Sequence, residues 1–162
     1  MAKGNKNKKK DREPTIENRK ARHLYTIEDT LEVGIRLTGT EVKSVRDTRV
    51  SIGEGFVTAT THPLRLTLHS VRIDPYDNAS AAFQHKPVHD RELLAHKREI
   101  QKLADAVQAK GITIVPLKIY FKNNLIKLQI GVAKGKSRVD KRQDLREREH
   151  QREIDRAMSK KV

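Results

Sequence analysis

The chain has no cysteine and no tryptophan, and aromatic residues make up only 4% of its 162 residues. The absence of cysteine excludes a disulfide framework and a thiolate zinc site, and it fits a reducing compartment. No apolar run approaches the roughly 20 residues that a membrane-spanning helix needs. The N-terminus is basic but lacks the apolar segment of a secretory signal. Together these absences predict a soluble, cytoplasmic protein.

Hydrophobic residues are also scarce, at 35% of the chain, and charged residues are equally common. The length fits one modest domain, since domains typically have about 100–200 residues. The low hydrophobic share predicts that part of the chain does not fold on its own.

Positive charge is concentrated at the two ends of the chain. Residues 1–23 hold nine Lys or Arg against three Asp or Glu, a net charge of +6, and residues 134–162 hold eleven against six, a net charge of +5. The middle carries the remaining +3 of a total of +14. Basic tails can simply keep a domain soluble, but two of them around a balanced centre favour a polyanionic partner. Nucleic acid is the leading candidate, because no segment shows the clean apolar face that membrane binding requires.

Hydrophobic periodicity predicts a β-rich centre. Leu31–Leu37 alternate apolar and polar residues with the period of a half-buried strand. Two further strands are expected at Phe56–Thr60 and Arg65–Ile73, the latter with an irregularity near His69. Residues 112–133 resemble a hairpin that turns at Asn123-Asn124, with an edge or a bulge at Pro116.

Two helices are expected beside these strands. A short one follows Gly39, with Thr40 as its N-cap, and a longer one begins at Asp90, carries Leu93 and Leu94 on its apolar stripe and stops at Lys110-Gly111. A long surface loop, residues 74–89, separates them. The predicted fold is mainly β with flanking α: a small six-stranded barrel like the oligonucleotide-binding (OB) fold, with one long and one short helix. Its predicted limits are residues 18–133, between a disordered basic arm (1–17) and a basic tail (134–162).

The usual catalytic and metal motifs are missing. "GVAKGKS" (131–137) has three residues between its glycines where a phosphate-binding P-loop needs four, although Lys134 and Lys136 would suit non-specific phosphate contact. Pro87 separates His85 from His89 and blocks a regular helix that would bring the two imidazoles together. No nucleophile motif is present. We therefore expect no enzyme activity, no cofactor and no metal.

The stretch "NRKARHLY" (18–25) precedes the first strand. It can form a phosphate clamp with a stacking surface at the barrel rim, or it can be a charged lead-in that only solvates the strand, and the residues alone weigh these equally. The side chains concerned are Arg19, Lys20, Arg22, His23 and Tyr25.

Three stretches together resemble the SsrA-binding protein family, also called small protein B. They are "NRKARHLYTIEDTLEVGIRLTGTEVKSVR" (18–46), "LLAHKREIQKL" (93–103) and "GITIVPLKIYFKNNLIKLQIGVAKGKSRVDKRQDLRERE" (111–149). The resemblance implies a monomeric bacterial RNA-binding factor that rescues stalled ribosomes in trans-translation. Its implied partners are the tRNA-like domain of transfer-messenger RNA (tmRNA, or SsrA RNA) and the ribosome, where the tail would enter the decoding centre and the mRNA channel.

The resemblance also implies site residues. The RNA face would include Glu32, Leu94 and Lys127, together with the entry segment that runs from Asn18 to His23. Glu92 and Ala95 replace a basic and a bulky residue of the family pattern.

The tail departs from the family pattern at the residue before "DKR". That residue is often aromatic in the family and is thought to stack in the decoding centre, but here it is Val139. Few apolar residues support a free helix in this segment, so we predict a tail that is disordered when free and helical on the ribosome. The tail residues expected at the ribosome are Arg138, Val139, Asp140, Lys141, Arg142, Arg146, Arg148, His150, Arg152 and Arg156.

Two other functions remain open from the residues alone. The first is a general barrel protein that binds structured RNA or takes part in ribosome assembly. The second, a hydrolase without a known motif, has no nominated residues.

Overall fold

The computed structural model describes residues 14–159, so most of the predicted N-terminal arm lies outside the described residues. Nine strands, four α-helices and one short 3₁₀ helix occur within that range. The elements are β1 (Ile16–Glu17), α1 (Arg19–Leu24), β2 (Tyr25–Ile35), α2 (Gly39–Arg46), β3 (Val50–Ser51), β4 (Phe56–Thr61), β5 (Leu64–His69), β6 (Arg72–Ile73), η1 (Ala81–Phe83), β7 (Arg91–Leu94), α3 (Lys97–Val107), β8 (Ile112–Lys122), β9 (Leu125–Gly135) and α4 (Arg138–Ser159).

Six of the strands close into a ring. Their hydrogen-bonded order is β8-β4-β5-β7-β2-β9, and β9 pairs with β8 again. All of these pairings are antiparallel, which confirms the predicted six-stranded barrel. Strand β1 adds to the outside of β8, so the last residues of the predicted arm belong to the sheet.

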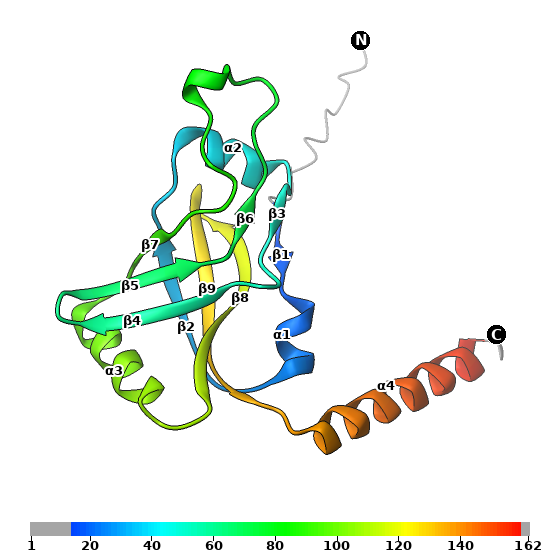
Figure 1. Ribbon diagram of the computed structural model, residues 1–162. Coiled ribbons are helices and arrows are strands. Elements are labelled where there is room, and N and C mark those ends of the chain that lie inside the picture. Colours follow the sequence, from blue (N-terminus) through cyan, green and yellow to red (C-terminus); the bar gives the residue numbers. More distant parts are fainter. Residues whose placement is uncertain (1–13, 160–162) are drawn as a thin grey trace, which may run out of the picture.

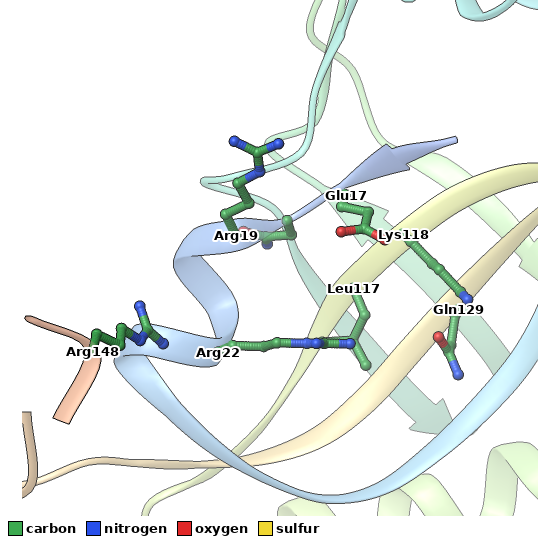
Figure 2. Close-up of a pocket in the computed structure, with 8 residues that line it drawn as sticks. Glu17, Arg19, Arg22, Leu117, Lys118, Gln129 and Arg148 are labelled. Carbon is green, nitrogen blue, oxygen red and sulfur yellow. The ribbon is translucent and has the colours of Figure 1, made fainter. Parts of the chain in front are cut away.

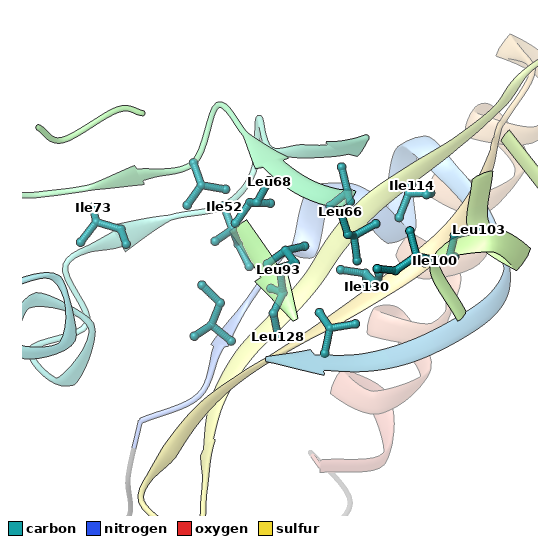
Figure 3. Close-up of a cluster of buried hydrophobic side chains, with 14 of the residues drawn as sticks. Ile52, Leu66, Leu68, Ile73, Leu93, Ile100, Leu103, Ile114, Leu128 and Ile130 are labelled. Carbon is teal, nitrogen blue, oxygen red and sulfur yellow. The ribbon is translucent and has the colours of Figure 1, made fainter. Parts of the chain in front are cut away.

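Successive side chains of a strand point alternately into and out of the barrel, and the inward ones are mostly aliphatic. Leu66 and Leu68 of β5, and Leu128 and Ile130 of β9, point inward and are fully buried (Figure 3). Helix α3 covers one end of the barrel, close to β4 and β5, and contributes buried apolar side chains such as Ile100 (Figure 1).

The turn chemistry expected from the sequence is confirmed. Asn123 and Asn124 both have positive φ, 51° and 63°, in the tight turn between β8 and β9. The register of β8 against β9 shifts just after Pro116, which is the predicted bulge. Ser70, with φ of 56°, breaks the predicted strand near His69 into β5 and β6.

The predicted helix starts are wrong in two places. Residues 91–94 form strand β7, because Leu93 pairs with Ile35 on one side and Leu66 on the other. Helix α3 begins only at Lys97, where the Glu99 carboxylate accepts the backbone N–H of His96 at 2.8 Å.

The short helix α2 exists as expected, but Thr38 rather than Thr40 is its N-cap. The basic lead-in to β2 is itself a helix, α1, capped by Asn18.

The basic tail leaves the barrel from β9 and continues as helix α4. This helix projects away from the body, on the side where α1 lies (Figure 1). No helix in the described part of the chain is long and apolar enough to cross a membrane.

Candidate nucleic-acid interface

Three predicted site residues that are far apart in the sequence meet on adjacent strands. Gly34 pairs with both Leu94 of β7 and Lys127 of β9, and Glu32 lies two residues before Gly34, on the same face of β2. All three side chains line one open pocket of about 420 Å³. We call Glu32, Leu94 and Lys127 the sheet site.

Glu32 is held as an anion in the sheet site. Its carboxylate accepts a hydrogen bond from the Tyr120 hydroxyl and pairs with Lys122 Nζ at 2.9 Å. The bonds from Tyr120 and then Lys122 lower the pKa of Glu32, with Lys127 adding a smaller effect. Burial, and then the same contact with Glu32, raise the pKa of Tyr120 to about 12. The site at neutral pH therefore presents a carboxylate, a phenol and two ammonium groups.

Leu94 gives the sheet site an apolar surface. Its side chain is 55% exposed and stands beside Gly34, where an added Cβ would lie only 3.2 Å from the Leu94 Cβ. A second pocket, of about 260 Å³, continues from Leu94 toward the exposed Leu125. An apolar side chain among charged groups suits contact with a nucleotide, whose base is flat and whose backbone is charged.

Glu92 and Ala95, the two residues of this region that depart from the family pattern, lie close to the sheet site. Glu92 pairs with Arg36 at 2.8 Å on the surface, and Ala95 packs against the core. The sequence could not identify Tyr120 and Lys122 as partners of Glu32, because that contact depends on the register of β8 against β9.

The side chain of Asn18 has a structural role. Its side chain is buried, accepts the N–H of Ala21 at 3.0 Å and donates to the carbonyls of Ile52 and Pro116. These three hydrogen bonds fix α1 to the barrel. Asn18 thereby sets the position of α1.

The basic residues of α1 have different surroundings. Lys20 pairs with Glu54 at 2.6 Å, and His23 is half-buried. Arg19 and Arg22 line a pocket together with Arg148 of the tail (Figure 2).

Tyr25 is half-buried against Ala21 and Ala133 in a second, small core. Its ring therefore contributes to packing as well as to the surface.

Lys136, predicted to contact phosphate, and Asp140, predicted as a tail residue, both organise the start of the tail. Lys136 is only 16% exposed, and its ammonium group donates to the Arg22 carbonyl at 3.1 Å and to the Asp144 carboxylate. That contact lowers the pKa of Asp144. Asp140 and Ser137 exchange backbone-to-side-chain hydrogen bonds of 3.1 and 3.2 Å, which cap the start of α4.

The remaining predicted tail residues lie along α4. Lys141 is partly exposed, and Val139 is 63% exposed. Lys134, at the end of β9, is exposed as well. Arg138 begins the helix. The exposed side chains further along α4 include Arg142, Arg146, Arg148, His150, Arg152 and Arg156.

Metal ligands do not gather in this part of the chain: among residues 14–159, no group of three or more His, Cys, Asp or Glu could hold an ion. His85 instead contacts the Thr40 hydroxyl at 2.9 Å and the Ile73 carbonyl, and His89 contacts the Glu41 carboxylate.

The fold and these surfaces define a class: a small closed antiparallel β-barrel with an exposed polar sheet site and a basic helical extension, suited to a polyanionic ligand. The model of the family described as "SmpB protein" matches residues 15–160. The chain belongs to this family.

Known relatives match most of the chain. An SsrA-binding protein of Lactiplantibacillus plantarum is 49% identical over 142 residues, covering 88% of this chain and 89% of that protein. An SsrA-binding protein of Microcystis aeruginosa is 47% identical over 144 residues, covering 89% and 92%. A solved structure described as "tmRNA-SmpB: a journey to the center of the bacterial ribosome" is 42% identical, with a TM-score of 0.65, covering 82% of this chain and 95% of that one.

Proposed function

We propose that this protein is an RNA-binding factor of trans-translation, which binds the tRNA-like domain of tmRNA and brings it to the A site of a stalled bacterial ribosome. Family membership and the names of the relatives support this role. The likeness to a chain described as tmRNA-SmpB supports it as well. The role consists of binding and delivery by a monomer in the cytoplasm and includes no catalytic step.

The observation that carries the proposal is the convergence of Glu32, Leu94 and Lys127 in one pocket. Lys127 supplies a cation for a phosphate, Glu32 an acceptor for a base or a 2′-hydroxyl donor, and Leu94 an apolar contact. Without the sheet site, a net charge of +14 alone would predict only unselective binding to polyanions.

The tail completes the proposed role. It would lie along ribosomal RNA, with its arginines near phosphates and its start near the decoding centre. We propose that it is disordered in the free protein and helical in that complex, because it has few apolar residues to stabilise a helix alone.

Titration with two RNAs of equal length tests the proposal. The full-length protein is titrated with the isolated tRNA-like domain of tmRNA and with a shuffled RNA at the same salt concentration. We expect tighter binding of the tRNA-like domain by at least about a thousandfold, the lower end of the usual specificity range of nucleic-acid-binding proteins. Equal affinities would instead support a general structured-RNA-binding protein, the second candidate function.

A further inference from the structure

A basic pocket lies between the barrel and the tail. Its lining includes Arg19 and Arg22 of α1, Lys118 of β8 and Arg148 of α4, with Glu17 as the one carboxylate, around a volume of about 250 Å³. Figure 2 shows Arg22 reaching across from α1 toward β8, while Arg148 approaches α1 from the tail. We call this the tail pocket.

The four cations of the tail pocket lack carboxylate partners. Within residues 14–159, neither Arg19, Arg22, Lys118 nor Arg148 forms an ion pair, whereas ten other pairs are present. Asp144, one helical turn before Arg148, already holds Lys136. The lining thus has four cations and one carboxylate, and although Asp144 also interacts electrostatically with Arg148, the pocket keeps a net positive charge.

The contact of Lys136 with both Asp144 and the Arg22 carbonyl holds this arrangement together. It draws α4 against α1 and thereby brings Arg148 toward the arginines of α1. Like charges repel each other, so the cations of α1, β8 and α4 oppose the docking that the Lys136 contacts favour. An anion bound between these cations would attract all of them and so favour the docked tail.

We propose that the tail pocket binds a phosphate of an RNA backbone, and that this phosphate fixes the tail against the barrel. Guanidinium groups form bidentate bonds with phosphate oxygens, and groups from the barrel and the tail can then share one ligand. By linkage, a phosphate that binds the docked tail more tightly shifts the tail toward that orientation. The identity of the RNA rests on the proposed function, but the affinity of the pocket for phosphate does not.

The first test compares two variants with the same loss of charge. R148Q removes the tail's contribution to the pocket, and R65Q removes an exposed arginine of β5 outside it. We expect R148Q to weaken binding of the tRNA-like RNA about tenfold more than R65Q does. The slope of log affinity against log salt should also be less steep by about one for R148Q, the effect of losing one phosphate contact.

The second test measures the position of the tail directly. The chain has no cysteine, so the double variant A109C/A157C can be spin-labelled at these two positions alone. One label then lies just after α3 and the other near the end of α4. Inorganic tripolyphosphate, and separately the tRNA-like RNA, should narrow the electron–electron distance distribution of the full-length protein. The R65Q background should respond in the same way, and the R148Q background should not respond.

The outcomes separate the two proposals. An equal response of R148Q and R65Q in both tests, or no response of the unmodified pocket to tripolyphosphate, overturns the tail pocket as a phosphate site. A response to tripolyphosphate in a protein that does not prefer the tRNA-like RNA supports the tail pocket and contradicts the proposed function.

Discussion

At the scale of single residues, the buried pair of Glu41 and Arg91 connects three parts of the chain. Both side chains are buried, and Arg91 Nε lies 2.7 Å from the Glu41 carboxylate, which His89 also contacts at 2.8 Å. The Arg91 guanidinium donates further to the carbonyls of Val71 and Pro87. The pair thus joins α2, β7 and the loop before β7. The sequence pattern does not indicate this pair, because it predicts a helix from residue 90 where the structure has a strand.

Replacing Glu41 by Gln should therefore destabilise the fold strongly. Removing one partner of a buried pair leaves the other charge without compensation, which costs about 3–5 kcal/mol. Urea unfolding measures the difference. E54Q, which removes the exposed partner of Lys20, is the matched control and should have little effect.

The effect of E41Q should depend on pH. Burial raises the pKa of Glu41, but the Thr38 N–H, Arg91 and His89 together outweigh burial, so the pKa lies below the ordinary 4.5. Because the folded pKa is lowered, the charged Glu41 contributes stability above the unfolded pKa and loses it as the pH falls through the folded pKa. The difference in the free energy of unfolding between wild type and E41Q should thus be constant from pH 7 to about pH 5 and become smaller below pH 4.5. A gap that stays constant in acid would contradict this assignment.

The sheet site makes a separate prediction. E32A and K127A should each weaken binding of the tRNA-like RNA about tenfold, the usual effect of losing one polar nucleic-acid contact. E28A, on the exposed face of the same strand, controls for the charge change and should bind the RNA like wild type. Wild-type affinity in both E32A and K127A would remove the sheet site from the RNA interface.

At the scale of elements, local patterns predicted most strands of the barrel but missed β7, and they placed the helix starts wrongly. The alternation in β2 and the Asn-Asn turn after β8 are local signals, and both are confirmed. The predicted N-cap of the long helix, Asp90, lies six residues before the observed N-cap, His96, because Leu93 and Leu94 also match a helical stripe. Pairing with β2 and β5 decides that they belong to a strand, and such non-local contacts leave no mark in the sequence. Likewise, Glu32, Leu94 and Lys127 were identified by resemblance, and only the sheet pairing explains why they meet.

Gly55 has no room for a larger side chain, because the side chains of Val71 and Pro116 approach its backbone closely. A Cβ at this position would lie 2.7 Å from Val71 Cγ2 and 2.9 Å from Pro116 Cγ, both on buried residues. G55A should lower the free energy of unfolding by about 1–3 kcal/mol through overpacking. G39A, at the open first turn of α2, has no atom within 4 Å of the new Cβ and serves as control. Equal stability of G55A and G39A in thermal unfolding would count against the packing described here.

The stability of helix α4 depends on the cap at its start and on what surrounds its side chains. Ser137 and Asp140 cap its start, but nearly all of its side chains are exposed. A peptide of residues 134–162 should therefore show little helix by circular dichroism in water and gain helix when RNA is added. S137A should reduce the helix reached with RNA, since losing a cap costs about 1 kcal/mol, whereas S159A at the far end should not. Full helicity of the peptide without RNA would contradict the proposed disorder of the free tail.

At the scale of the whole molecule, the proposed function assigns selective binding to the closed barrel and unselective attraction to the basic extension. The sheet site, with its paired carboxylate, lies on the barrel, whereas the ends of the chain hold most of the net charge of +14. Attraction to phosphates weakens as salt rises, while contacts to bases and hydroxyls persist. Composition alone predicted the unselective part. The residues of the proposed selective part follow from the family resemblance, and the register of the strands explains why they meet.

The central claim is selective binding of tmRNA, and the RNA recovered with the tagged full-length protein from a bacterial lysate tests it most directly. The wild-type protein should recover tmRNA far above its share of cellular RNA, and the double variant E32A/K127A should lose that enrichment while still retaining bulk RNA through its basic tail. Recovery of ribosomal and transfer RNA in proportion to their abundance by the wild-type protein would contradict the claim.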